Sequence, residues 1–143
     1  MKLPTPQPGQ VISYAYVWRD EAASGVEEGR KDRPCVIVLA AVTTDEATIV
    51  TVVPVTHAHP GNDDLAVELS VSTKARLGLD HERSWVVVNE INRFTWPGYD
   101  LRLTRRGADT CLFGVLPRVV YNAIRDGVVA AARANRLKIT SRE

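Results

Sequence analysis

The stretch 25-GVEEGRKDRPCVIVLA-40 joins a charged, glycine-bounded loop to a run of apolar and β-branched residues. Such a run is typical of a buried strand, and a loop that leads directly into one is anchored on a rigid element. Pro34 fixes its own φ and biases Arg33 toward an extended backbone, so the Arg33 side chain is predicted to lie at the mouth of the strand. We therefore expect functional residues at this junction.

On either side of this stretch, short β-forming segments alternate with turn residues. Prolines at positions 4, 6 and 8 make residues 1–9 an extended lead-in, because proline cannot join a ladder or a helix interior. Pro54 interrupts one segment and is expected at an edge or a bulge. A helical turn is expected at 74–77, capped by Ser72 or Thr73. The predicted strands are 10–18, 34–41, 47–56, 65–70, 84–94 and 110–115.

After Pro117 the apolar period changes from that of a strand to that of a helix. Val120, Ile124, Val128 and Ala131 recur at helical spacing, which predicts one long helix over 117–137. Short strands followed by a C-terminal helix indicate a β-rich α+β fold, a compact antiparallel barrel with a helix packed on it. We expect residues 1–143 to form a single domain.

Composition narrows the class of protein without naming a partner. The 143 residues are 45% hydrophobic and 24% charged, an ordinary globular mixture. The formal net charge of +1 does not predict wholesale binding to nucleic acid, although a local basic patch remains compatible with it. Cys35 and Cys111 lie in apolar runs without a metal-type spacing, so neither a disulfide framework nor a structural metal is expected. No secretory or membrane-spanning segment is evident, and we expect a cytoplasmic protein.

Several motifs occur in one order and spacing. Gly9 precedes a strand, a Gly25-x-Glu27 element leads to 33-RPCVIV-38, and 52-VVPVT-56 and 84-SWVVVNE-90 follow. Together, over roughly residues 8–125, these segments resemble the PemK/MazF toxins of type II toxin-antitoxin systems, which act as growth inhibitors. The resemblance implies an SH3-like antiparallel barrel that forms a homodimer. It also implies an endoribonuclease that cleaves single-stranded RNA without a metal or another cofactor, and a cognate antitoxin protein as partner.

The resemblance places the catalytic arginine on Arg33 and the catalytic threonine on Thr56. Both assignments suit RNA cleavage, because a guanidinium offers a fixed fork of donors to phosphate and a hydroxyl can donate to the same group. The alternative for Arg33 is a surface arginine paired with Glu27, Glu28 or Asp32. The alternative for Thr56 is a hydroxyl that only stabilises a turn.

The residues after Thr56 add acid-base candidates. His57 occupies a place where the family commonly has a small polar residue, and histidine is the usual proton carrier in metal-free RNA cleavage. His59 is better explained as a solvent-exposed loop residue. The H-x-H pair has no further metal ligand nearby in the sequence, so we predict no metal site. Glu27 is a candidate to complete the acid-base set.

Five residues are candidates for RNA binding. Arg30 and Lys31 flank Arg33 and suit an RNA backbone, while Trp18 and Trp96 could stack on bases. The alternative for both tryptophans is packing at the rim of the core. Asn89 stands where some relatives have a catalytic aspartate, and it keeps hydrogen-bonding capacity without acid-base function.

A second function class remains open at this point. Asn89, the Val87 that replaces an arginine of some relatives, and His57 are also compatible with a non-catalytic binding module of the same barrel, as in the CcdB toxins that act on DNA gyrase. An enzyme would lose RNA cleavage in Arg33→Ala, whereas a binding module would not cleave RNA at all.

Overall fold

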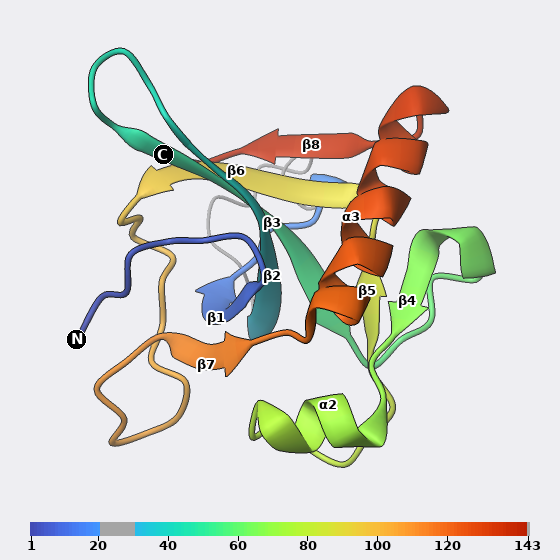
Figure 1. The fold of residues 1–143 in the computed structure, drawn as a ribbon, viewed down its shortest axis with the longest axis horizontal. Coiled ribbons are helices and arrows are strands. Elements are labelled where there is room, and N and C mark those ends of the chain that lie inside the picture. Colours follow the sequence, from blue (N-terminus) through green and yellow to red (C-terminus); the bar gives the residue numbers. More distant parts are fainter. Residues whose placement is uncertain (21–30, 143) are drawn as a thin grey trace.

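The computed structural model describes residues 1–20 and 31–142. Within these residues, eight strands form one curled and mostly antiparallel sheet, and the long helix α3 crosses one face of it (Figure 1). The strand order is β4-β5-β3-β2-β1-β7, with β6 added to β3 and β8 added in parallel to β6. The expected fold class, a β-rich barrel with a C-terminal helix, is therefore confirmed as a curled half-barrel.

The elements have the following bounds in chain order. They are β1 (Gln10–Ala15), β2 (Asp32–Val42), β3 (Thr48–Thr56), the 3-10 turn η1 (Asp63–Leu65), β4 (Ala66–Glu68), α2 (Val71–Arg76), β5 (Trp85–Val87), β6 (Glu90–Trp96), β7 (Leu112–Val115), α3 (Arg118–Arg133) and β8 (Lys138–Ser141).

Alternation along the central strands divides the buried side chains between two clusters. On β2, Val36 packs in the cluster that includes Ile124 of α3, while Cys35 and Ile37 pack in the cluster that includes Phe94. Successive strand residues point to opposite faces, so one strand contributes to both clusters. The sheet thus has one face under α3 and the other folded on itself.

The predicted strand 84–94 is wrong as a single element. It divides into β5, which pairs with β4 and the end of β3, and β6, which pairs with the first part of β3. In the connecting turn, the backbone of Val88 donates to Leu65 and that of Asn89 accepts from Lys138. The Val88 side chain lies where Gly127 leaves room on α3, since a Cβ at Gly127 would approach it within 3.0 Å.

The predicted helix 117–137 ends too late. The helix stops at Arg133, and Asn135 has a φ of 57°, a left-handed conformation that favours termination. Residues 138–141 then form β8 beside β6. Their polar composition concealed a strand that is held by pairing to its neighbour.

Other predicted boundaries need smaller corrections. The first strand ends at Ala15 instead of residue 18, and the fourth covers only Ala66–Glu68. The helical turn begins earlier, at Val71, because the cap is Ser70 and not Ser72 or Thr73: the Ser70 hydroxyl accepts from the backbone N–H of Thr73.

Pro54 lies in an internal strand instead of at an edge. Its position is tolerated because β3 changes neighbours there: β6 pairs as far as Val52, and β5 pairs from Val55 onward.

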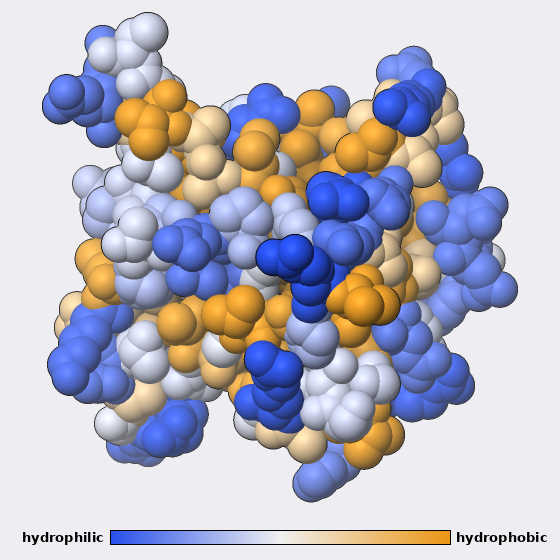
Figure 2. Space-filling view, viewed as in Figure 1, coloured by the Kyte–Doolittle hydropathy of each residue, from blue (hydrophilic) through white to orange (hydrophobic). Residues whose placement is uncertain are grey.

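The surface and the helices complete the description of the fold. On the face that carries α3, apolar groups are separated by strongly hydrophilic ones (Figure 2). Of the helices in the described chain, none is both long and apolar enough to cross a membrane.

Candidate functional site

The antiparallel register of β2 and β3 brings Arg33 and Thr56 together. The ladder pairs Cys35 with Pro54, so its continuation places Arg33 opposite Thr56, at the start of β2 and the end of β3. Nη1 of Arg33 donates to the Val55 carbonyl at 3.4 Å, which confirms that the arginine lies against this end of β3. Two residues 23 positions apart in the sequence are therefore neighbours at one edge of the sheet.

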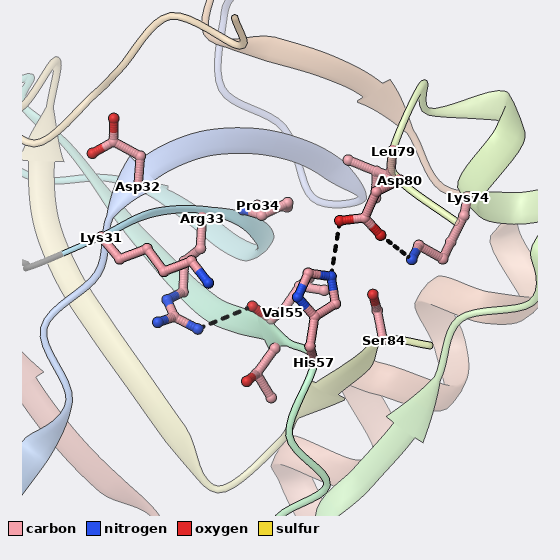
Figure 3. Close-up of a pocket in the computed structure, with 11 residues that line it drawn as sticks. Lys31, Asp32, Arg33, Pro34, Val55, His57, Lys74, Leu79, Asp80 and Ser84 are labelled. Carbon is pink, nitrogen blue, oxygen red and sulfur yellow. Dashed lines mark hydrogen bonds and ion pairs between the residues drawn. The ribbon is translucent and has the colours of Figure 1, made fainter. Parts of the chain in front are cut away.

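A cavity of about 160 Å³ opens at this edge (Figure 3). Its walls come from β2, from the end of β3, from α2 and from the segment that precedes β5. The polar lining consists of Lys31, Asp32, Arg33, Thr56, His57, Lys74, Asp80 and Ser84.

Arg33 keeps most of its donors available. Its guanidinium carbon lies 5.1 Å from the ring centroid of Trp18, which supports the group from one side. Its Nε is buried without a hydrogen-bond partner, and Arg33 makes no ion pair within residues 1–20 and 31–142. Asp32 instead lies 3.6 Å from Nε of Arg102, so the expected alternative of an Arg33–Asp32 pair is not found. The other alternative partners, Glu27 and Glu28, lie outside the described residues.

Thr56 makes a local contact that orients its hydroxyl. Oγ1 accepts a hydrogen bond from the backbone N–H of Ala58 at 3.2 Å. Because the hydroxyl acts there as an acceptor, its proton remains able to donate to a second group. Thr56 can therefore stabilise the turn through Ala58 and still donate its hydroxyl proton to a group bound in the cavity.

His57 lies between two carboxylates. Its Nε2 is 2.9 Å from Oδ2 of Asp80, and its Nδ1 is 3.1 Å from Oε2 of Glu82. A neutral imidazole carries only one N–H, so only the protonated ring can donate to both carboxylates at once. His57 thus lies between two hydrogen-bond acceptors, and it donates to both only in a form that carries a proton on each ring nitrogen.

Asp80 is anchored by a buried cation. The Lys74 side chain is only 6% exposed, and its Nζ lies 2.7 Å from Oδ1 of Asp80 and donates to the carbonyl of Glu82. The hydrogen bond from Lys74 holds the pKa of Asp80 below its usual range, with a smaller contribution from His57. Figure 3 shows the resulting chain from His57 through Asp80 to Lys74.

The chain was compared with known proteins. A family model described as "PemK-like, MazF-like toxin of type II toxin-antitoxin system" matches residues 15–95, which is more than half of the sequence. The chain belongs to this family. No significant match was found among curated proteins. The family match runs from the last residue of β1 into β6 and thus includes Arg33, Thr56 and His57 of the cavity.

The site residues predicted from the sequence divide into three groups. Arg33, Thr56, His57 and Lys31 line the cavity, and Trp18 contacts Arg33. Trp96 and Asn89 do not line it, and Glu27 and Arg30 lie outside the described residues.

Trp96 and Asn89 are placed elsewhere by the β3–β6 pairing. Trp96 is opposite Thr48, at the other end of β3 from Thr56, which is roughly 26 Å along the strand at about 3.3 Å per residue. It packs against the Phe94 cluster, the rim-of-core alternative. Asn89 is buried in the β5–β6 turn, where its carbonyl accepts from the backbone of Lys138. A direct RNA contact in this cavity is therefore not available to either residue.

The two histidines of the H-x-H pair do not face a common point. His59 accepts from the backbone N–H of Gly61 at Nδ1 and lies 2.9 Å from Asp63 through Nε2. His59 therefore stabilises its own loop, while His57 faces the cavity.

His57, Asp80 and Glu82 offer ligand atoms that lie within 4.8 Å of one another, a donor set that could also hold a divalent cation. Lys74 already occupies one oxygen of Asp80, which competes with such a role. The absence of a metal requirement stays a prediction.

Sequence reasoning missed Lys74 and Asp80. A lysine within a short helix and an aspartate 6 positions later are ordinary surface residues by pattern, and only the burial of Lys74 distinguishes them.

Proposed function

We propose that this protein is the toxin of a type II toxin-antitoxin system and a metal-independent endoribonuclease that cleaves single-stranded RNA. The observation that carries the proposal is the meeting of Arg33, Thr56 and His57 at one cavity. These residues combine a phosphate-binding cation, a hydroxyl donor and one of the two proton carriers that such a reaction needs. Family membership supports the toxin class.

In the proposed reaction, the ribose 2′-oxygen attacks the adjacent phosphorus and loses its proton to a base. The bond from phosphorus to the 5′-oxygen breaks, and the leaving 5′-oxygen receives a proton. The products are a 2′,3′-cyclic phosphate and a 5′-hydroxyl. Arg33 stabilises the charge that develops on the phosphate oxygens, and the Thr56 hydroxyl donates to the same phosphate.

His57 is the proposed general acid for the leaving oxygen. Its two carboxylate partners differ in a way that selects the reacting nitrogen. Asp80 is fixed by buried Lys74, whereas the Glu82 side chain is 72% exposed. The substrate can therefore displace Glu82 from Nδ1 while Asp80 keeps the ring oriented through Nε2. Glu27 was predicted to complete the acid-base set, and with His57 as the acid we assign it the role of general base.

Lys31 and Trp18 are proposed RNA-binding residues. Lys31 is exposed at the cavity, and the Trp18 ring packs under the Arg33 guanidinium, where it positions that group and can stack on a base. We further propose, from family membership, a homodimer, a cognate antitoxin as protein partner, and action in the cytoplasm, where the RNA substrate is found.

The test is RNA cleavage in the presence of EDTA by wild type, Arg33→Ala and Arg33→Lys. Loss of one preorganised donor to a transition-state oxyanion typically costs about 10²–10³ in rate, and lysine does not restore the fork. Arg133→Ala is the control, because Arg133 is an exposed arginine in the last turn of α3. Equal cleavage by wild type and Arg33→Ala would refute the assignment.

Failure of folded wild type to cleave any of several single-stranded RNAs would refute the enzyme and favour the non-catalytic binding module of the same fold. A circular dichroism melt of each variant shows whether the fold is retained.

A further inference from the structure

We propose that a second cavity beside Arg33 binds a phosphate-linked segment of the RNA next to the cleaved bond. This inference rests on the proposed function. The second cavity has a volume of about 550 Å³ and shares Asp32, Arg33 and Pro34 with the first. Arg33 therefore stands in the wall between two cavities, and a strand held at Arg33 can extend from one to the other.

The second cavity is rich in cationic groups. Arg102, Arg105 and Arg106 line it together with Arg33, and Asp32 is the single carboxylate among its described lining residues. A concave site lined by one sign of charge concentrates ligands of the opposite sign. The cavity is thus suited to a polyanion.

The arginines differ in how they are held. Nη1 of Arg102 donates to the carbonyls of Tyr99 and Leu101, at 2.6 and 3.2 Å, and its Nε lies 3.6 Å from Asp32. This guanidinium is therefore oriented in advance. Arg105 and Arg106 are exposed, and across residues 1–20 and 31–142 neither makes an ion pair. Two cations without acidic partners are available to bind phosphates.

The remaining lining suits the other parts of a nucleotide. Leu101, Leu103 and Phe113 add apolar and aromatic surface to the same cavity. Single-stranded RNA sites combine cations that follow the backbone with surface on which bases or riboses pack. A volume of about 550 Å³ falls within the usual size of a ligand pocket, so it can contain a nucleotide unit.

Two other exposed arginines, at the far end of α3, provide a control in which the same amount of charge is removed away from the second cavity. The segment between β6 and β7 lies at the lower left in Figure 1, whereas the end of α3 lies at the upper right. The corner formed by this segment carries strongly hydrophilic groups in Figure 2. Arg133 and Arg136, in the last turn of α3 and just after it, are exposed arginines at this other end of the molecule.

The experiment measures binding without cleavage. The probe is a 12-nucleotide 2′-O-methyl RNA, which lacks the attacking hydroxyl, and its affinity is followed by fluorescence anisotropy from 50 to 300 mM NaCl. Wild type is compared with Arg105→Gln/Arg106→Gln and with Arg133→Gln/Arg136→Gln. With respect to residues 1–20 and 31–142, these four side chains form neither an ion pair nor a side-chain hydrogen bond, and thermal melts check that each variant is folded.

For single strands, log K changes with log salt by about −0.7 per phosphate contact. If the two arginines each hold a phosphate, the Arg105→Gln/Arg106→Gln variant should lose about 1.4 from this slope and roughly tenfold in affinity near physiological salt. The α3 variant should match wild type. Equal slopes for wild type and the Arg105→Gln/Arg106→Gln variant, equal losses in both double variants, or no binding by wild type would overturn the inference.

The readout separates this inference from the proposed function. If the Arg105→Gln/Arg106→Gln variant changes the salt slope but wild type does not cleave RNA, the RNA-binding role of the second cavity is supported and the ribonuclease activity is refuted. If wild type cleaves RNA but the slope is unchanged in the variant, the ribonuclease activity is supported and the RNA-binding role of the second cavity is refuted.

Discussion

Nε2 of His57 lies 2.9 Å from Oδ2 of Asp80, and this contact is the fixed one of the two that the imidazole makes. Buried Lys74 holds the other oxygen of Asp80 at 2.7 Å, whereas the second partner of the ring, Glu82, is largely exposed. The ring is therefore anchored on one side and replaceable on the other. The two carboxylates should respond differently to substitution.

Asp80→Asn should lower the RNA cleavage rate by roughly tenfold or more, because positioned acid-base catalysis typically contributes about 10²–10⁴ and the amide weakens the orientation of His57. Glu82→Gln, at the replaceable contact, should have a much smaller effect. Single-turnover rates across pH would check this, with a changed pH–rate profile only for Asp80→Asn. Equal rates and equal profiles for both variants would show that Asp80 does not position His57.

Lys74→Met should destabilise the protein at neutral pH by about 1–2 kcal/mol, since it leaves a half-exposed carboxylate without its cation. The pKa of Asp80 is lowered in the folded state, so the wild-type pair stabilises above the usual aspartate pKa and loses this contribution as pH falls through the folded pKa. The difference between wild type and Lys74→Met in urea unfolding should therefore shrink between about pH 5 and about pH 2. A difference independent of pH would contradict the ion-pair explanation.

Glu90→Gln should make stability less dependent on pH in the mildly acidic range. Glu90 is buried, and burial raises its pKa, although its bonds from the Tyr16 hydroxyl and the Arg19 backbone N–H oppose this. Folded Glu90 then binds more protons than it does in the unfolded chain, so its contribution to stability falls as pH rises from the usual glutamate value through the folded pKa. Glutamine keeps both acceptor contacts and removes that fall.

Glu68 offers the matched control for Glu90. Hydrogen bonds from Arg83 lower the pKa of Glu68, so its contribution has the opposite sign. Chemical denaturation of Glu90→Gln and of the matching Glu68→Gln between about pH 4 and about pH 8 would compare how their stabilities depend on pH. A wild-type curve that Glu90→Gln leaves unchanged would exclude the burial effect.

Thr56→Val should reduce cleavage by roughly tenfold or more, because it removes the hydroxyl with little change of shape and leaves a phosphate oxygen without its donor. Thr56→Ser, which keeps the hydroxyl, should retain most activity. Rates at saturating RNA would separate the two variants. Equal loss in both would mean that the methyl group, and not the hydroxyl, matters at this position.

The sequence predicted the positions of strands and of the long helix well where one segment carries its own signal. The run that becomes β2 and the period that becomes α3 are both evident from apolar spacing. The division of residues 84–94 into two strands was not evident from apolar spacing. It depends on Leu65, Lys138 and the space at Gly127, which only the fold brings close to this segment. β8 was missed for the same reason, since its pairing with β6 and not its composition makes it a strand.

Prediction of the site was limited in the same way, because contacts between distant segments cannot be read from the sequence. Arg33 and Thr56 could be proposed from their motifs, but their opposition depends on the β2–β3 register, which the sequence does not specify. Lys74 and Asp80 carried no motif at all. Trp96 was assigned by its proximity to a turn, and the β3–β6 register places it at the far end of β3.

The most direct test of the central claim is the chemistry of the RNA ends that wild type produces in EDTA. The proposed mechanism predicts 2′,3′-cyclic phosphate and 5′-hydroxyl ends, and no cut at a position where the substrate carries a single 2′-deoxy nucleotide. Ends with a 3′-hydroxyl and a 5′-phosphate, or continued cleavage at the 2′-deoxy position, would contradict attack by the 2′-hydroxyl and with it the role assigned to Arg33, Thr56 and His57.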